Sequence, residues 1–308
     1  MNTKVEIINN LKRLGVRHGD TLFLRISYKA IGETEGGPET LIEALLDVIG
    51  PDGTIIAAAF PHRQTFKHST HKVIYEPGKN LSTGLIPKLL SEHPNACFSS
   101  HPLSPFVCVG KNAQKLTDYH TPEKSNMDLL AYAMQISAPK CLRVGGAILT
   151  GTTHIAFSEG LKRSGNYHLR KPEGIYYRDE KGKLRFQYQN MSFFCKKGLE
   201  KFCNQYIYTN PNAVIGEGTV GQGEALLTDM RKTLEIERKY IVPNPQILLC
   251  DNPECLHCRS SYSYSDYSVL QYIIKLIKMK FKGEYTRNHL MKDIRDNLII
   301  FFWGRKCL

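Results

Sequence analysis

The stretch at residues 20–60 constrains the fold of this chain most strongly, because two short apolar runs flank one amphipathic segment. Residues 20–27 and residues 54–60 have the length and composition of buried strands. Glu39–Ile49 lies between them with its apolar residues at helical spacing, and Pro38 suits the first turn of a helix. A strand, a helix and a second strand in this order favour an α/β fold with parallel pairing.

Further elements continue this pattern along the chain. Apolar positions at helical spacing predict a helix over residues 3–15, with Gly15 as its C-terminal stop. Additional helices are expected at residues 81–90, 111–116 and 127–135, a strand at the end of 97–110, another at 140–149, and a hairpin at 166–188. We therefore expect a mixed, largely parallel sheet flanked by helices.

A turn rich in glycine and threonine follows the strand at residues 140–149 and carries His154. A buried strand that ends in a turn is a rigid platform for a catalytic side chain, and the nearby glycines let backbone approach a ligand closely. A single histidine in such a position is more often a structural residue than a catalyst. The turn by itself leaves both interpretations open.

The composition of the chain restricts its environment. It has 308 residues, 42% of them apolar and 23% charged, which allows a sizeable core. Its nine cysteines form no closely spaced framework, no cleavable apolar leader follows Met1, and no uncharged apolar run reaches about 18 residues. These features predict a reduced, cytoplasmic protein that does not span a membrane.

The net charge of +12 is concentrated toward the C-terminus, where residues 267–308 hold nine lysines and arginines against three acidic residues. Apolar residues at helical spacing beside these lysines suit an amphipathic helix on an anionic membrane surface. A helix that docks on the rest of the chain, or on a second copy in a homodimer, fits the same pattern. The sequence shows no recognition helix, repeated zinc motif or RNA-binding strand, so we do not expect nucleic acid as a partner.

Two clusters could suggest a metal site. His62, His68 and His71 lie in a polar loop without nearby carboxylates or cysteines, which is more typical of a solvated loop or a substrate lid. Cys255 and Cys258 have the spacing of a zinc knuckle, and Cys250 or His257 could add a third ligand. A structural zinc site needs four ligands and no second pair follows, so we predict no metal requirement.

Four blocks in order resemble the aminoglycoside 3-N-acetyltransferase family. The first is LGVRHGDTLFLRISYKAIGETEGGPETLIEALLDVIGPDGTIIAAAF at residues 14–60, with a Gly-Asp turn, a strand ending in serine and a Gly-Gly-Pro helix start. His101-Pro102 with Ser104, the Gly-rich block at residues 144–154, and VGQGEA at residues 220–225, interpreted as the start of a helix, follow it. The resemblance covers about residues 5 to 250 and implies the α/β fold of that family.

The resemblance implies an acetyltransferase that moves the acetyl group of acetyl-CoA to the amine of an amino sugar. An amine is mostly protonated at neutral pH, so its attack on a thioester needs a base, and histidine has a suitable pKa. The family's base corresponds to His154, and backbone amides or hydroxyls around Thr152 and Thr153 are candidates to stabilise the thioester oxyanion. No cysteine lies in this block, so no nucleophile for an acyl-cysteine route is evident.

The resemblance places donor contacts at the end of the first strand, although only Ser27 matches the family's pattern closely and a plain strand end is the alternative. Ser104 could contact the donor or form a structural turn. The candidates for binding acetyl-CoA are Arg25, Ser27, Tyr28, Lys29, Ser104 and Thr152.

The acid that supports the histidine departs from the family's pattern, because Phe157 stands where many members have glutamate. Glu159 follows two positions later and is our candidate, with Asp128 or Glu224 as alternatives. A histidine without an acidic partner, or an inactive member of the family, are further possibilities. We expect His154→Ala to abolish transfer and Glu159→Gln to weaken it.

The basic charge of the chain bears on the acceptor. A polycationic drug fits it poorly, whereas an amino sugar on a nucleotide or lipid carrier in surface glycan biosynthesis fits the sign of the charge. An aminoglycoside acetyltransferase and a non-catalytic module that binds polyanions or metal are the alternatives. We divide the chain into an acyltransferase domain (1–250), a Cys-containing linker (251–266) and a basic amphipathic helical extension (267–308).

Overall fold

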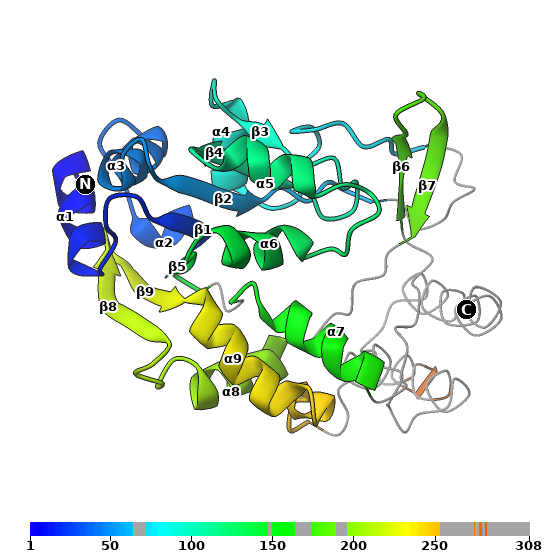
Figure 1. Ribbon diagram of the computed structural model, residues 1–308. Coiled ribbons are helices and arrows are strands. Elements are labelled where there is room, and N and C mark those ends of the chain that lie inside the picture. The colour runs from blue at the N-terminus through cyan, green and yellow to red at the C-terminus, as the bar shows by residue number, and fades with distance from the viewer. Residues whose placement is uncertain are drawn as a thin grey trace.

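The computed structural model of the chain describes residues 1–63, 72–146, 150–163, 174–188 and 196–252, with residues 274, 277, 278 and 281 beyond them. A seven-stranded mixed sheet has the order β3-β4-β2-β1-β5-β9-β8, and helices cover both of its faces (Figure 1). Its strands are β1 (Thr21–Ile26), β2 (Thr54–Ala58), β3 (Cys97–Phe98), β4 (Phe106–Gly110), β5 (Lys140–Val144), β8 (Val214–Val220) and β9 (Gly223–Asp229). The helices are α1 (Lys4–Arg13), α2 (Tyr28–Ile31), α3 (Glu39–Ile49), α4 (Leu85–Glu92), α5 (Ala113–Tyr119), α6 (Asp128–Ile136), α7 (Thr153–Arg163), α8 (Lys196–Tyr206) and α9 (Met230–Ile241).

The N-terminal elements form where the sequence predicts them. Thr3 and Glu6 make a reciprocal capping box at the start of α1, which satisfies backbone donors that the first turn leaves open. Pro38 is the N-cap of α3, and β1 pairs with β2 in parallel, with Thr21 opposite Thr54. The predicted strand–helix–strand unit is confirmed.

The centre of the sheet is a topological switch point. β1 lies between β2 and β5 and runs parallel to both, so the chain leaves β1 toward one side and later returns on its other side. Antiparallel strands extend the sheet on both edges. Ligands of open α/β sheets bind at the carboxyl ends of the strands that flank such a point. The ends of β1 and β5 are therefore the natural place for a site.

Residues 220–225 correct one prediction. They form the end of β8, a two-residue turn at residues 221 and 222, and the start of β9, where Val220 pairs with Gly223, and not the start of a helix. Gly221 has a φ of 56°, which suits a tight hairpin. The helix starts only at α9, where the side chain of Asp229 caps it by accepting from the amides of Arg231 and Lys232.

One hydrophobic cluster lies on each face of the sheet. Leu22 and Leu24 of β1 contribute to the cluster beneath α1 and α3. Phe23 of β1 and Cys141 of β5 contribute to the opposite cluster, which α6, α7, α8 and α9 cover. Alternation along a strand therefore assigns Arg25 to the same face as Phe23.

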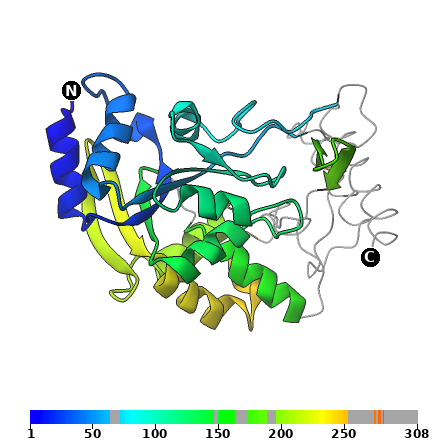
Figure 2. The same cartoon turned by 45° about the horizontal axis from the view of Figure 1, so that its top comes forward.

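The predicted hairpin is present as β6 (Gly174–Arg178) and β7 (Leu184–Tyr188). Both views place it at the far end of the molecule from α1 and α3 (Figure 1, Figure 2). The amide of Tyr75 donates to the carbonyl of Tyr176 at 2.7 Å, and Gln187 donates to the carbonyl of Pro122 at 3.1 Å. These bonds attach the hairpin to neighbouring loops.

The C-terminal linker and extension lie almost entirely outside the described residues, so the domain boundaries, the membrane contact and the dimer remain predictions. No helix in the part of the chain that the structure describes is both long and apolar enough to cross a membrane.

Candidate functional site

The turn that carries His154 packs directly on the central strand. Gly151 has a φ of 83°, and a Cβ atom there would lie 2.6 Å from the ring of Phe23. The carbonyl of Thr152 accepts from the amides of Ile155 and Ala156 at 2.9 and 3.3 Å, so α7 begins at once after it. His154 is the second residue of α7 and is partly buried. The close contact with Phe23 allows only glycine at position 151.

A buried glutamate anchors this turn. Oε1 of Glu237, on α9, accepts from the hydroxyl of Thr150 at 2.7 Å and from that of Thr153 at 2.6 Å. The hydroxyls of Thr150 and Thr153 lie 2.9 Å apart, and Thr152 donates to that of Thr150 at 3.2 Å. All four side chains are buried. The network fixes the residues on both sides of the bend and thereby the start of α7.

Burial raises the pKa of Glu237 to about 7, and the threonine hydroxyls oppose this rise. Its Oε2 atom is buried and has no hydrogen-bond partner among the residues that the structure describes. A carboxylate that keeps its charge in such a place loses water without full compensation, which favours the neutral form. Glu237 is therefore poised to change its charge near neutral pH.

The other acids considered for His154 have different partners. Both oxygens of Glu159 bond to Arg238 of α9, at 2.7 and 2.9 Å, and Glu159 lies five positions after His154 on α7. Asp128 accepts from the amide of Ser125 at 2.8 Å at the start of α6, and the side chain of Glu224 is exposed on β9. Phe157, which replaces the expected glutamate, is fully buried in the core. Glu237, which lies far along the chain, contacts the turn through Thr150 and Thr153.

Three of the predicted donor contacts, Ser27, Tyr28 and Lys29, follow the carboxyl end of β1. The amide of Ser27 donates to the carbonyl of Val144 at 3.0 Å, which joins the ends of β1 and β5. Ser27 and Tyr28 are partly buried, whereas Lys29 is exposed. Thr152 and Thr153 direct their hydroxyls into the Glu237 network.

Arg25 and Arg143 stand opposite each other on β1 and β5. Both are partly buried, and the guanidinium of Arg143 lies 4.7 Å from the ring centre of Tyr208. Burial lowers the pKa of Arg25, and the nearby Cys141 and Tyr208 oppose this shift. This pairing brings together one predicted donor residue and one arginine that the sequence did not single out as functional.

Ser104 lies inside the core and not at the surface. It is fully buried, and its amide donates to Nδ1 of His101 at 3.0 Å. His101 stacks on His120 with ring centres 4.7 Å apart, and burial, aided by His120, lowers the pKa of His101 to about 3. Burial also lowers the pKa of His120 to about 4. This packing favours the structural alternative for Ser104.

Among the described residues, no group of three or more histidine, cysteine or acidic side chains is arranged to hold a metal ion. His62 and Cys250 are within the described part of the chain. His68, His71, Cys255, His257 and Cys258 lie outside it.

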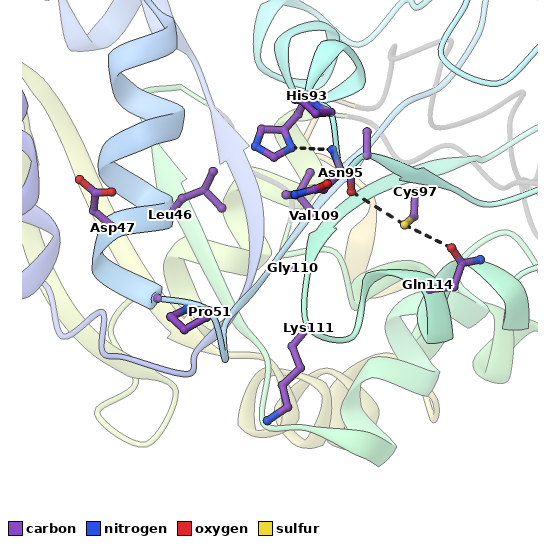
Figure 3. Close-up of a pocket in the computed structure, with 13 residues that line it drawn as sticks. Leu46, Asp47, Pro51, His93, Asn95, Cys97, Val109, Gly110, Lys111 and Gln114 are labelled. Atoms are coloured by element: carbon purple, nitrogen blue, oxygen red, sulfur yellow. Dashed lines mark hydrogen bonds between the residues drawn. The ribbon is translucent and has the colours of Figure 1, made fainter.

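A separate hollow of about 970 Å³ lies at the opposite end of the central strands, between the end of α3 and the turn from β4 to α5 (Figure 3). Two polar side chains of its lining bond to other parts of the protein. Lys111 pairs with Asp52 at 2.7 Å, and the thiol of Cys97 donates to Oε1 of Gln114 at 3.5 Å. Burial, with a smaller effect of Asp118, raises the pKa of Cys97. The thiol is therefore a poor nucleophile.

The fold and the site define an α/β protein whose histidine-bearing turn lies beside the switch point of a mixed sheet. The chain belongs to the aminoglycoside 3-N-acetyltransferase family, whose model matches residues 23–241.

Individual proteins agree with this assignment. Aminoglycoside N(3)-acetyltransferase III from Salmonella sp is 32% identical over 168 residues, which are 49% of this chain and 56% of that relative. The chain thus matches little more than half the length of the curated relative. A crystal structure of aminoglycoside acetyltransferase AAC(3)-IVa in complex with a gentamicin has a TM-score of 0.66 at 21% identity, over 80% of this chain and 91% of that one. The binary complex of AAC-IIIb with CoASH has a TM-score of 0.64 at 18% identity, over 78% and 96%. At these identities the two structures confirm the fold.

Proposed function

We propose that this protein is an acetyl-CoA-dependent N-acetyltransferase that acts on an amine of an amino sugar, with His154 as general base. The observation that carries the proposal is the Thr150–Thr153 turn, which Glu237 anchors through two threonine hydroxyls and which places His154 in the first turn of α7. One similar structure contains CoASH, which is the donor without its acetyl group. Another contains a gentamicin, which is an amino-sugar compound.

In the proposed reaction the free amine attacks the thioester carbonyl of acetyl-CoA. A carbon–nitrogen bond forms, the imidazole of His154 takes the proton from nitrogen, and the carbon–sulfur bond breaks to release CoA. Backbone amides near Thr152 and Thr153 stabilise the oxyanion, while Ser27, Tyr28 and Lys29 contact the donor. We assign Glu237 and its threonines the role of positioning the histidine.

We place Glu159 in a supporting role. Its ion pair with Arg238 joins α7 to α9 and so limits the movement of the helix that carries His154. An exposed pair of this kind is typically worth about 0 to 1 kcal/mol, so its loss should weaken transfer only modestly.

The proposed acceptor is an amino sugar of surface glycan biosynthesis, because the chain carries a net charge of +12. An aminoglycoside is the second candidate, favoured by the names of the similar proteins. Mass spectrometry of products from acetyl-CoA with a panel of amino-sugar nucleotides, phosphorylated amino sugars and aminoglycosides separates the two.

His154→Ala tests the proposed base. Because no other group is assigned to deprotonate the amine, transfer should fall by about two to four orders of magnitude. His93→Ala is the matched control, since His93 lines the separate hollow at the other end of the sheet. Unchanged turnover in folded His154→Ala protein would refute the mechanism.

A further inference from the structure

The arginines on β1 and β5 form an unusual pair within the sheet. Arg25 and Arg143 are directly opposed in the parallel register, two positions beyond the pair of Phe23 and Cys141. Within the described part of the chain, the Nε atom of each is buried without a hydrogen-bond partner. No ion pair joins either guanidinium to a carboxylate among the same residues. Two arginines thus occupy opposed positions on one face of the sheet, and the described residues supply no acceptor for either Nε atom.

Such an arrangement is unfavourable for the isolated protein. Removal of a guanidinium from water costs free energy that a carboxylate or a network of acceptors normally offsets. The second arginine lies at the same level on the neighbouring strand and brings a charge of the same sign. The ring of Tyr208 offsets part of this for Arg143 through a cation–π contact. Glu237 offers little further compensation, because its Oε1 accepts from threonine hydroxyls and burial favours its neutral form.

We infer that Arg25 and Arg143 together bind an oxyanion, a phosphate or a carboxylate, carried by the acceptor molecule. The inference rests on the proposed transferase function and adds the chemical class of the substrate. Guanidinium groups present several N–H donors in a planar fork that matches the oxygens of such anions. A bound anion would supply the compensation that the protein lacks.

Position assigns the anion to the acceptor and not to the donor. The His154 turn packs through Gly151 on Phe23, and Arg25 lies two residues farther along the same strand face, a distance of about 7 Å. The acceptor's amine must reach this turn for His154 to deprotonate it. The phosphates of CoA, by contrast, are separated from the thioester by the long pantetheine arm. A group beside the turn is therefore within reach of a small acceptor.

Calorimetry without acetyl-CoA tests the site independently of activity. The probes are glucosamine 6-phosphate, glucosamine and inorganic phosphate, titrated into wild type, Arg25→Gln, Arg143→Gln and the exposed control Arg13→Gln. We expect wild type and control to bind glucosamine 6-phosphate at least about tenfold more tightly than glucosamine, and both site variants to lose that preference. Inorganic phosphate should likewise bind only wild type and control.

The remaining outcomes discriminate among causes. Equal binding of both sugars by the wild type overturns the inference. In a separate titration with acetyl-CoA, loss of acetyl-CoA affinity in Arg25→Gln and Arg143→Gln, with sugar preference intact, would assign the anion to the donor and also overturn the inference. Arg25→Gln and Arg143→Gln should unfold at or above the denaturant concentration that unfolds the wild type, because each removes an uncompensated charge. Arg25→Lys is the variant that keeps the charge without the planar fork of N–H donors. Arg-dependent binding without acetylation of any amine would leave the anion site standing and refute the proposed function instead.

Discussion

Replacement of Glu237 by glutamine should change how the stability of the protein depends on pH. The native pKa of Glu237 is about 7 against an ordinary value of 4.5, chiefly because of burial. The native state therefore holds the proton more tightly than the unfolded chain does. Wild-type stability consequently carries no penalty from this group below about pH 4.5, falls as the pH rises, and carries the full penalty above about pH 7.

The size of the effect follows from the pKa difference. At about 1.4 kcal/mol per pKa unit, the penalty reaches about 3 kcal/mol. Glu237→Gln keeps an acceptor oxygen for Thr150 and Thr153 and removes the titration. Its amide nitrogen replaces the unpartnered Oε2, which adds a cost that does not depend on pH. The difference in free energy of unfolding between Glu237→Gln and wild type should therefore shift by about 3 kcal/mol in favour of the variant from about pH 4 to about pH 8. This shift does not depend on any constant difference in stability between the two proteins.

Urea unfolding at intervals across this range measures the difference. Glu217→Gln removes an exposed carboxylate from β8 and is the matched control, which should follow the wild type. A difference between Glu237→Gln and wild type that stays constant from low to high pH would refute the reasoning. It would mean that the buried carboxyl binds its proton no more tightly than the unfolded chain.

Three further substitutions test the geometry around His154. Gly151→Ala should lower the free energy of unfolding by about 2 kcal/mol or more, because the new methyl group meets Phe23 at 2.6 Å in a backbone with φ of 83°. Urea unfolding measures this loss. Gly182→Ala is the control for the effect of the backbone alone, because Gly182 has a φ of 72° and no atom within 4 Å of the added Cβ. Glu159→Gln and Arg238→Gln should lower kcat by similar, small factors if their ion pair only holds α7; a far larger loss in Glu159→Gln alone would show a direct catalytic role.

Local sequence patterns predicted most of the elements. Apolar periodicity and Pro38 fixed α3 at Glu39–Ile49, and the turn residues within 166–188 indicated the β6–β7 hairpin. The error at residues 220–225 arose because Gly-Gln-Gly suits both a helix start and a two-residue hairpin turn. The strand partner β8 decided between them, since pairing across the sheet is not encoded in a local period.

The candidate site shows the same division. The sequence determined that a Gly- and Thr-rich turn carries His154, because chain order and residue type suffice for that. It did not indicate Glu237, which meets Thr153 from 84 positions away, or the opposition of Arg25 and Arg143. Those contacts depend on which strands and helices become neighbours. Desolvation follows from the same packing, so only the tertiary structure decides where a carboxyl gains a pKa near 7 and where two guanidinium groups are left to meet an anion.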